Sequence, residues 1–191
     1  YYATPRCVAY IPEVTARQYT IMRLAIPQDV AFMITASPAT QLQLARLADR
    51  YKEMLIRDIH DGTLAGRWEI PGWVRRECEL RIRPAPDVAR RLEAIVERTG
   101  RLLPKDFWQL SFLANWTGGT MGLYLRDFPE YFGDVPVRDI GLLASEGRVS
   151  IPVEDNTPAG ILDIPGQFFE FIPAEEIRSR RPTVLRAHEL E

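Results

Sequence analysis

The stretch QLSFLANWTGGTMGLYL, residues 109–125, contains the clearest α/β signal of the chain. Residues 109–116 have the composition of a strand, Thr117-Gly118-Gly119-Thr120 forms a glycine-rich turn, and a helical run follows from Met121 to about Phe132. A strand, a turn and a helix in this order form the usual start of a βαβ unit. The stretch therefore predicts an α/β fold with helices packed on a largely parallel sheet.

The residues before this unit predict the order helix, strand, helix. We expect a first helix over residues 13–26, begun by a capping box of Thr15 and Gln18. Residues 30–35 form a continuous apolar run, which suits a strand buried on both faces. Ser37-Pro38 then favours the start of a second helix, because serine caps helices and proline is favoured at the first helical position.

Glycines end the predicted helices. Gly62 ends the second helix, and residues 63–86 predict an irregular connection with room for a short helix. Asp87 predicts the cap of a further helix, which ends at Gly100.

The chain after the βαβ unit is predicted to be rich in β-structure. A strand ends at Ala144, residues 155–160 form a turn, and residues 168–172 form a last strand. We therefore expect an αβα part with an irregular connection over residues 1–83, and a helix, the βαβ unit and the β-rich part over residues 84–191.

Composition excludes several classes of protein. The net charge of -2 predicts neither nucleic-acid binding nor attraction to an anionic membrane, and no apolar run reaches the roughly 20 residues that span a bilayer. Two cysteines, Cys7 and Cys78, do not make a disulfide framework, which favours the cytoplasm. Lys52 and Lys105 are the only lysines, and this excess of arginine is compatible with a GC-rich bacterial coding sequence.

Two short motifs are candidates for chemistry. The glycines of Thr117-Gly118-Gly119-Thr120 would let backbone amides approach an anionic ligand, although a plain tight turn explains them too. Ser145-Glu146 would place a carboxylate at the carboxyl end of a buried strand, where open α/β sheets bind ligands. Such a carboxylate can hold Mg²⁺ against phosphate oxygens; the alternative is a solvated glutamate in a turn.

Other polar residues favour structural interpretations. Glu170 alternates outward among three phenylalanines, which is typical of a half-buried strand. The basic run of Arg178, Arg180 and Arg181 favours a solvated loop over a phosphate clamp. His60 and His188 have no partner at metal-ligand or catalytic-triad spacing.

The order of several motifs resembles the acyl acid amido synthetases of the Gretchen-Hagen type, also called the auxin-responsive promoter family, which has bacterial relatives. The residues that carry the resemblance are Trp116 to Thr120, Tyr124, Tyr131-Phe132-Gly133, Gly141 to Gly147 and Phe169 to Pro173. The helix that ends in Asp58-Ile59-His60-Asp61-Gly62 fits the same family, so the resemblance covers nearly the whole chain.

The resemblance implies an adenylate-forming enzyme, which uses ATP and Mg²⁺ to activate a carboxylic acid as an acyl-adenylate and then transfers it to an amine, usually of an amino acid. Of the family's three nucleotide motifs only the second is present here; in plant members it reads Tyr-Ala-Ser-Ser-Glu and lies over Leu142, Leu143, Ala144, Ser145 and Glu146. By this resemblance Ser145 faces the α-phosphate, Glu146 is the catalytic residue that binds Mg²⁺, and Gly118, Gly119 and Thr120 line the adenylate and the acyl chain.

Two departures from the family pattern shape the prediction. Leu142 replaces the usual aromatic residue, so an aliphatic contact would replace stacking on adenine. The first and third nucleotide motifs are missing, which predicts an internal, inactive fragment of a large N-terminal adenylation domain. Transfer to a thiol such as coenzyme A, and a non-catalytic acyl- or nucleotide-binding relative, remain the alternatives.

Overall fold

A three-stranded parallel sheet lies at the centre of the computed structural model, which describes residues 2–190. Its strands are β1 (Phe32–Ile34), β2 (Phe112–Asn115) and β3 (Val137–Asp139), in the order β1-β2-β3. Phe32 lies opposite Phe112, and Leu113 lies opposite Val137. The predicted α/β fold with a parallel sheet is therefore confirmed.

The connection between β2 and β3 forms the predicted βαβ unit, but with a broken crossover helix. The 3₁₀ turn η2 (Gly119–Met121) is followed by the short helices α7 (Gly122–Leu125) and α8 (Phe128–Phe132). Pro129 lies in the first turn of α8, where its missing N–H costs no helical hydrogen bond. The sequence predicted one helix here, because its apolar residues continue across the break.

The elements at the start of the chain follow the expected order of helix, strand and helix. The 3₁₀ turn η1 (Arg6–Tyr10) leads to α1 (Val14–Ala25), which is capped by Glu13 rather than by a Thr15 capping box. The Glu13 carboxylate accepts hydrogen bonds from the N–H groups of Thr15, at 3.0 Å, and Ala16. Ser37 caps α2 (Pro38–Arg50) as predicted, with its hydroxyl 3.3 Å from the amide of Ala39.

The predicted second helix is two helices. After α2, Tyr51 leaves the helical conformation, with φ -111° and ψ 24°, and α3 (Lys52–Asp61) begins. The connection contains the short helix α4 (Gly72–Glu79), and α5 (Pro86–Thr99) and α6 (Pro104–Phe107) follow. Gly62 and Gly100 end α3 and α5 with φ of 69° and 72°, as predicted, whereas Asp87 makes no capping hydrogen bond.

Two hydrophobic clusters hold these elements together. The larger joins η1 and the helices α1 to α5 around buried side chains such as those of Tyr19, Leu55 and Val74. The smaller joins α2 and α8 to the sheet through Leu42, Leu113 and others. Burying one such large apolar side chain contributes about 1.5–3 kcal/mol, so these clusters are the main source of stability.

The prediction that residues 30–35 are buried on both faces is wrong. β1 is an edge strand, and its Phe32 and Ile34 side chains are 49% and 59% exposed. Phe32 stacks on Phe112 of β2, with ring centroids 4.9 Å apart. Helices pack on the Met33 side of the strand, and no other described residues bury its second face.

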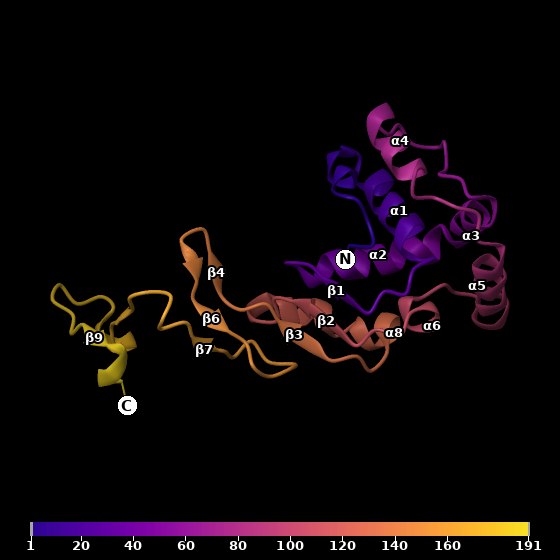
Figure 1. Cartoon of the computed structure of the whole chain (residues 1–191). Coiled ribbons are helices and arrows are strands. Elements are labelled where there is room, and N and C mark those ends of the chain that lie inside the picture. Colours follow the sequence, from indigo (N-terminus) through magenta and orange to yellow (C-terminus); the bar gives the residue numbers. More distant parts are fainter. Residues whose placement is uncertain (1, 191) are drawn as a thin grey trace.

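Antiparallel hairpins make up the C-terminal part, which confirms the predicted β-rich region. The pairs are β4 (Leu143–Ala144) with β5 (Gly147–Arg148), β6 (Ser150–Ile151) with β7 (Ile161–Leu162), and β8 (Glu170–Phe171) with β9 (Leu185–Arg186). The 3₁₀ turns η3 (Ala174–Glu176) and η4 (Ala187–Glu189) flank β9. Figure 1 shows these hairpins as an arm that extends away from the helical part, and residues 142–190 contain no buried residue.

Candidate functional site

The carboxyl ends of β2 and β3 are joined by a single buried carboxylate. Asp139, the last residue of β3, is 6% exposed. Its Oδ2 accepts hydrogen bonds from the backbone N–H and the hydroxyl of Thr117, at 2.6 and 2.7 Å, and its Oδ1 accepts one from the N–H of Gly141 at 2.7 Å. The start of the Thr117–Thr120 loop and the start of the following hairpin region are therefore fixed by the same side chain.

A tryptophan makes a second link between these two segments. The Trp116 indole N–H donates to the Gly141 carbonyl at 2.8 Å. Gly118 lies against Pro158, because a Cβ on Gly118 would stand 3.2 Å from the proline Cβ, whereas Gly119 has φ 58° and open space around it. The glycines thus let the loop pass a neighbouring segment and then turn through a left-handed conformation.

A pair of buried amides lies beneath the same edge of the sheet. The Asn115 side-chain amide donates to Gln41 Oε1 at 2.9 Å, and Gln41 in turn donates to the carbonyls of Met33 and Ala114, each at 3.1 Å. Both side chains are fully buried, and Asn115 Oδ1 has no hydrogen-bond partner within the described chain. Buried polar groups are normally paired, so the unpaired Asn115 Oδ1 marks this edge of the sheet as a polar place in the core.

The predicted position of Ser145-Glu146 is wrong in one respect. The last strand of the parallel sheet ends at Asp139, and Ser145 and Glu146 form the two-residue turn between β4 and β5 instead of following a buried strand. Both residues are exposed, and neither side chain makes a hydrogen bond or an ion pair within residues 2–190. A two-residue turn is the commonest connection of a β-hairpin, and Gly147 completes it.

Gly141 explains why the chain leaves the sheet. Its φ is 82°, and a Cβ there would lie 2.3 Å from the carbonyl oxygen of Ser150. Beyond Gly141 the Leu142 N–H donates to the Ser150 hydroxyl at 3.0 Å. The apolar run that suggested one strand ending at Ala144 is therefore divided by a glycine turn.

The two candidate segments are held together at the residues where they begin, but not at the residues that follow. The segment of Gly118, Gly119 and Thr120 follows Thr117, and the segment of Leu142 to Glu146 follows Gly141, so Asp139 and Trp116 hold both starting points together. Leu142 and Leu143 are 61% and 38% exposed. No hydrogen bond within the described part of the chain joins the two outer parts.

Sequence reasoning missed Asp139, Asn115 and Gln41. The available signal was position: Asn115 ends an apolar run, and Asp139 stands two residues before a glycine. The carboxyl ends of neighbouring parallel strands meet at one edge, which would have brought Asn115 and Asp139 together. Gln41 gave no signal, because a glutamine on a helix is ordinarily exposed.

An apolar cavity of about 420 Å³ lies beside the loop. It is lined by Thr117, by Phe128 of α8, by Val137 of β3 and by Pro158, among others. The crossover helices of the βαβ unit thus leave accessible apolar surface next to the glycine-rich loop.

The remaining candidates lie elsewhere. Glu170 is exposed and faces Arg186 across the β8–β9 pair, and Arg178, Arg180 and Arg181 lie on the surface. The buried, free thiols of Cys7 and Cys78 are neighbours, and burial raises the pKa of Cys78 to about 12. The described residues contain no cluster of three or more side chains suited to a metal ion.

A parallel sheet with a glycine-rich loop after β2 and an exposed hairpin after β3 defines an α/β domain with its polar edge at the carboxyl ends of the strands. The chain belongs to the GH3 family, because residues 1–137 match the GH3 family N-terminal domain. The hairpin with Leu142 to Glu146 lies beyond the matched residues.

Solved structures extend the likeness to the C-terminal part. The chain is similar to a structure described as "GH3.15 acyl acid amido synthetase", with TM-score 0.77 and 16% identity over 99% of this chain and 35% of that one. A second, "AtGH3.15 acyl acid amido synthetase in complex with 2,4-DB", gives TM-score 0.71 and 17% identity over 94% and 32%. The chain thus spans about a third of the length of these structures. Among curated proteins none matches.

Proposed function

We propose that this chain is an internal segment of the large domain of an ATP-dependent acid–amido ligase. Its proposed task is to contribute part of the nucleotide site with which the longer protein activates a carboxylic acid as an acyl-adenylate for transfer to an amine, in particular that of an amino acid. The observation that carries the proposal is the fold match over 99% of the chain to an acyl acid amido synthetase, together with the GH3 family membership.

The proposed nucleotide site combines the glycine-rich loop with the β4–β5 turn. Gly118, Gly119 and Thr120 lie beside the adenylate and the acyl chain, and Ser145 faces the α-phosphate. Leu142, with Leu143 and Ala144 next to it, provides an aliphatic contact for adenine. Support comes from Asp139 and Trp116, which hold both segments at one edge of the sheet.

Glu146 is the proposed ligand of Mg²⁺. Its carboxylate fits this task, because it is exposed at a turn and no described side chain occupies its oxygens. Magnesium is usually held by one or two carboxylates plus substrate phosphates, so a single glutamate is a suitable partner. The bound ion would neutralise the charge that moves onto pyrophosphate in the transition state. The chain's own contribution is to fix that carboxylate at the end of a short hairpin.

The other parts of the proposal concern the protein's setting. We place it in the cytoplasm, because its two cysteines, Cys7 and Cys78, are free and a reducing compartment suits them. Within the described residues, no helix is both long and apolar enough to cross a membrane. We expect this segment alone to be inactive, and we expect a bacterial source from its arginine-rich composition.

Pyrophosphate release by the full-length protein tests the proposal. Release from ATP should require a carboxylic acid, and Glu146→Ala should slow it by about 10²–10³-fold, the usual effect of removing one group that stabilises a transition state. Glu154→Ala removes an exposed glutamate of the same arm and should leave the rate unchanged. A Glu146→Ala variant that keeps most of the rate would exclude the magnesium assignment.

The same assay separates the alternatives. Stimulation by one amino acid identifies an amide-forming ligase, and stimulation by coenzyme A identifies thioester formation. Nucleotide binding without pyrophosphate release for any acid would favour a non-catalytic relative, an alternative that the exposed Leu142 in place of an aromatic residue supports.

A further inference from the structure

On the helical side of the molecule lies a cavity whose charged lining residues, among those that the structure describes, are all arginines. It measures about 540 Å³ and lies between the start of the chain, α1 and the segment that follows α4. Arg6, Arg23, Arg81 and Arg83 line it, and no aspartate or glutamate of residues 2–190 does. None of the residues of the proposed nucleotide site is part of this cavity, so it is a separate feature.

Arg23 is a buried cation without a direct anionic partner. Arg23 as a whole residue is only 2% exposed. Its Nε donates to the Thr63 carbonyl at 2.9 Å and its Nη2 to the Asp58 carbonyl at 2.8 Å, and both acceptors are neutral backbone groups. No ion pair of Arg23 exists within residues 2–190. Burial lowers the pKa of Arg23, and the charge of Asp58 opposes this.

The Asp58 carboxylate is already occupied by neutral donors. Its Oδ2 accepts from the Tyr19 hydroxyl at 2.7 Å and the Ala65 N–H at 2.6 Å, and its Oδ1 accepts from the Thr63 hydroxyl at 2.7 Å. Arg23 therefore bonds to the backbone of Asp58 while other groups take its carboxylate. A buried charge is costly unless it is paired, so the Arg23 site favours an anion from outside the chain.

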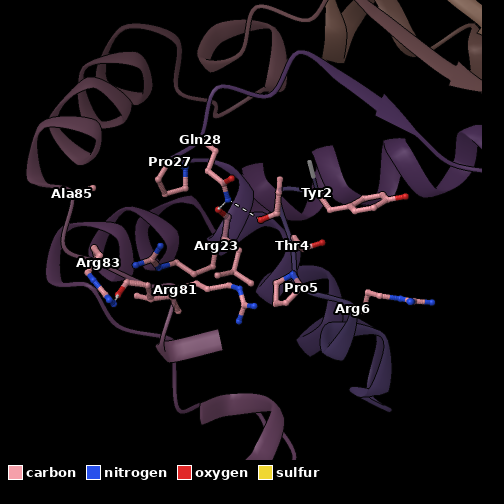
Figure 2. A pocket seen from close by; sticks show the side chains of 13 residues that line it. Tyr2, Thr4, Pro5, Arg6, Arg23, Pro27, Gln28, Arg81, Arg83 and Ala85 are labelled. Atoms are coloured by element: carbon pink, nitrogen blue, oxygen red, sulfur yellow. Dashed lines mark hydrogen bonds between the residues drawn. The ribbon is translucent and has the colours of Figure 1, made fainter. Parts of the chain in front are cut away.

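Arginines after α4 reach the same cavity from the other side. Figure 2 shows Arg23, Arg81 and Arg83 grouped around it, while Arg6 extends away. Arg81 is neutralised by the Glu77 carboxylate, but within the described chain Arg83 donates only to the Ile82 carbonyl, at 2.7 Å. Within residues 2–190, Arg6, Arg23 and Arg83 therefore lack a carboxylate partner, and of these Arg23 and Arg83 are the two grouped around the cavity.

We propose that this cavity, the arginine pocket, binds a phosphate-type oxyanion, either free or as the phosphoryl group of a small molecule. Guanidinium groups present N–H donors in a planar fork that matches oxyanions and makes charge-assisted hydrogen bonds. The binding is independent of the adenylation proposed above. Arg23 supplies the buried charge, and Arg83 supplies the exposed one that an incoming anion meets.

Titration calorimetry with inorganic phosphate tests the arginine pocket, with sodium chloride at equal ionic strength as the reference. Arg83→Gln should weaken phosphate binding about tenfold, equivalent to about 1.4 kcal/mol, while Arg91→Gln, on the exposed side of α5, should not. Arg23→Lys keeps the positive charge but loses the planar set of guanidinium N–H donors, so it should weaken phosphate binding as well. If Arg23→Lys does not fold, the result for Arg83→Gln alone tests the proposal. Phenyl phosphate in place of phosphate distinguishes a phosphoryl group from the free ion.

Three results would overturn the proposal that the arginine pocket binds an oxyanion. The first is equal phosphate binding by the wild-type protein and Arg83→Gln, and the second is no binding beyond the chloride reference. The third is loss of phosphate binding in Glu146→Ala, which would place the ion at the proposed nucleotide site and leave the adenylation proposal intact. Unchanged phosphate binding in Glu146→Ala, together with loss of pyrophosphate release, would support both proposals separately.

Discussion

Asp139 is the residue on which the geometry of the candidate site depends most directly. Three donors converge on its two oxygens, from Thr117 and Gly141, and all three belong to segments that leave the sheet. Hydrogen bonds to a charged group contribute about 1.5–3 kcal/mol each, more than those between neutral groups. This carboxylate is therefore a positioning group for both segments, although it lies at the base of the site.

Asp139→Asn is expected to lower the free energy of unfolding by about 2–4 kcal/mol, because one carboxylate oxygen becomes an NH₂ group that faces a donor. Urea unfolding of the variant measures this loss. Thr117→Val, which removes only the hydroxyl donor, should cost about 1.5 kcal/mol, the lower end of the range for a single hydrogen bond to a charged group. Equal losses in the two variants would show that the charge of Asp139 is not what holds the loop.

The sequence makes the candidate segments conspicuous, but it does not reveal the contacts between them. Gly118, Gly119 and Ser145-Glu146 were singled out because glycine, hydroxyl and carboxylate groups are conspicuous in an apolar chain. The contacts of Asp139 with Thr117 were not predictable, because they join residues that are 22 positions apart and depend on strand register. The prediction failed where Gly141 turns the chain, since a single glycine within an apolar run does not reveal its φ.

Among the helices, the glycine ends were the most reliable predictions and the N-terminal caps the least. Gly62 and Gly100 were expected and found, because a left-handed residue at a helix end strongly favours glycine. Glu13 was not expected as a cap, because serine, threonine, aspartate and asparagine are the usual choices. The break at Tyr51 also escaped prediction, since apolar periodicity continues through it.

Gly62→Ala and Gly100→Ala should differ in their effect on stability, although both glycines have a positive φ. At Gly100 a Cβ meets no atom within 4 Å, so only the left-handed backbone penalty of about 1 kcal/mol applies. At Gly62 a Cβ would lie 2.5 Å from the Pro84 nitrogen, which adds a backbone clash. Thermal or urea unfolding should give a loss for Gly62→Ala at least about twice that of Gly100→Ala. Equal losses would mean that the Pro84 segment moves aside freely.

At the scale of the whole molecule, the protein has a well-packed helical part and a C-terminal arm without a hydrophobic core. The α/β class and the β-rich end were predictable because hydrophobic periodicity and glycine turns report them directly. The exposure of Phe32 and Ile34 was not predictable. An apolar strand sequence indicates that both faces of the strand favour burial, but it does not show whether other residues of the same chain bury them.

Limited trypsin digestion should cut the arm before the helical part. Arg148, Arg178 and Arg180 lie in the arm, where few buried contacts oppose local opening. Arg57 and Arg91 are equally exposed but lie within helices, so they serve as internal controls. Mass spectrometry should find N-terminal products that retain residues up to Arg148. Early cleavage at Arg57 or Arg91 at a comparable rate would contradict this order.

The strand order β1-β2-β3 also has a consequence for the time course of folding. Phe32 pairs with Phe112, so the sheet cannot close until the helices α2 to α6 between them have left the ribosome. Contacts between residues far apart in sequence form slowly, while helices form from local contacts. During synthesis β1 therefore stays unpaired until Phe112, 80 residues after Phe32, has been made, and at that stage chaperones or aggregation compete with folding.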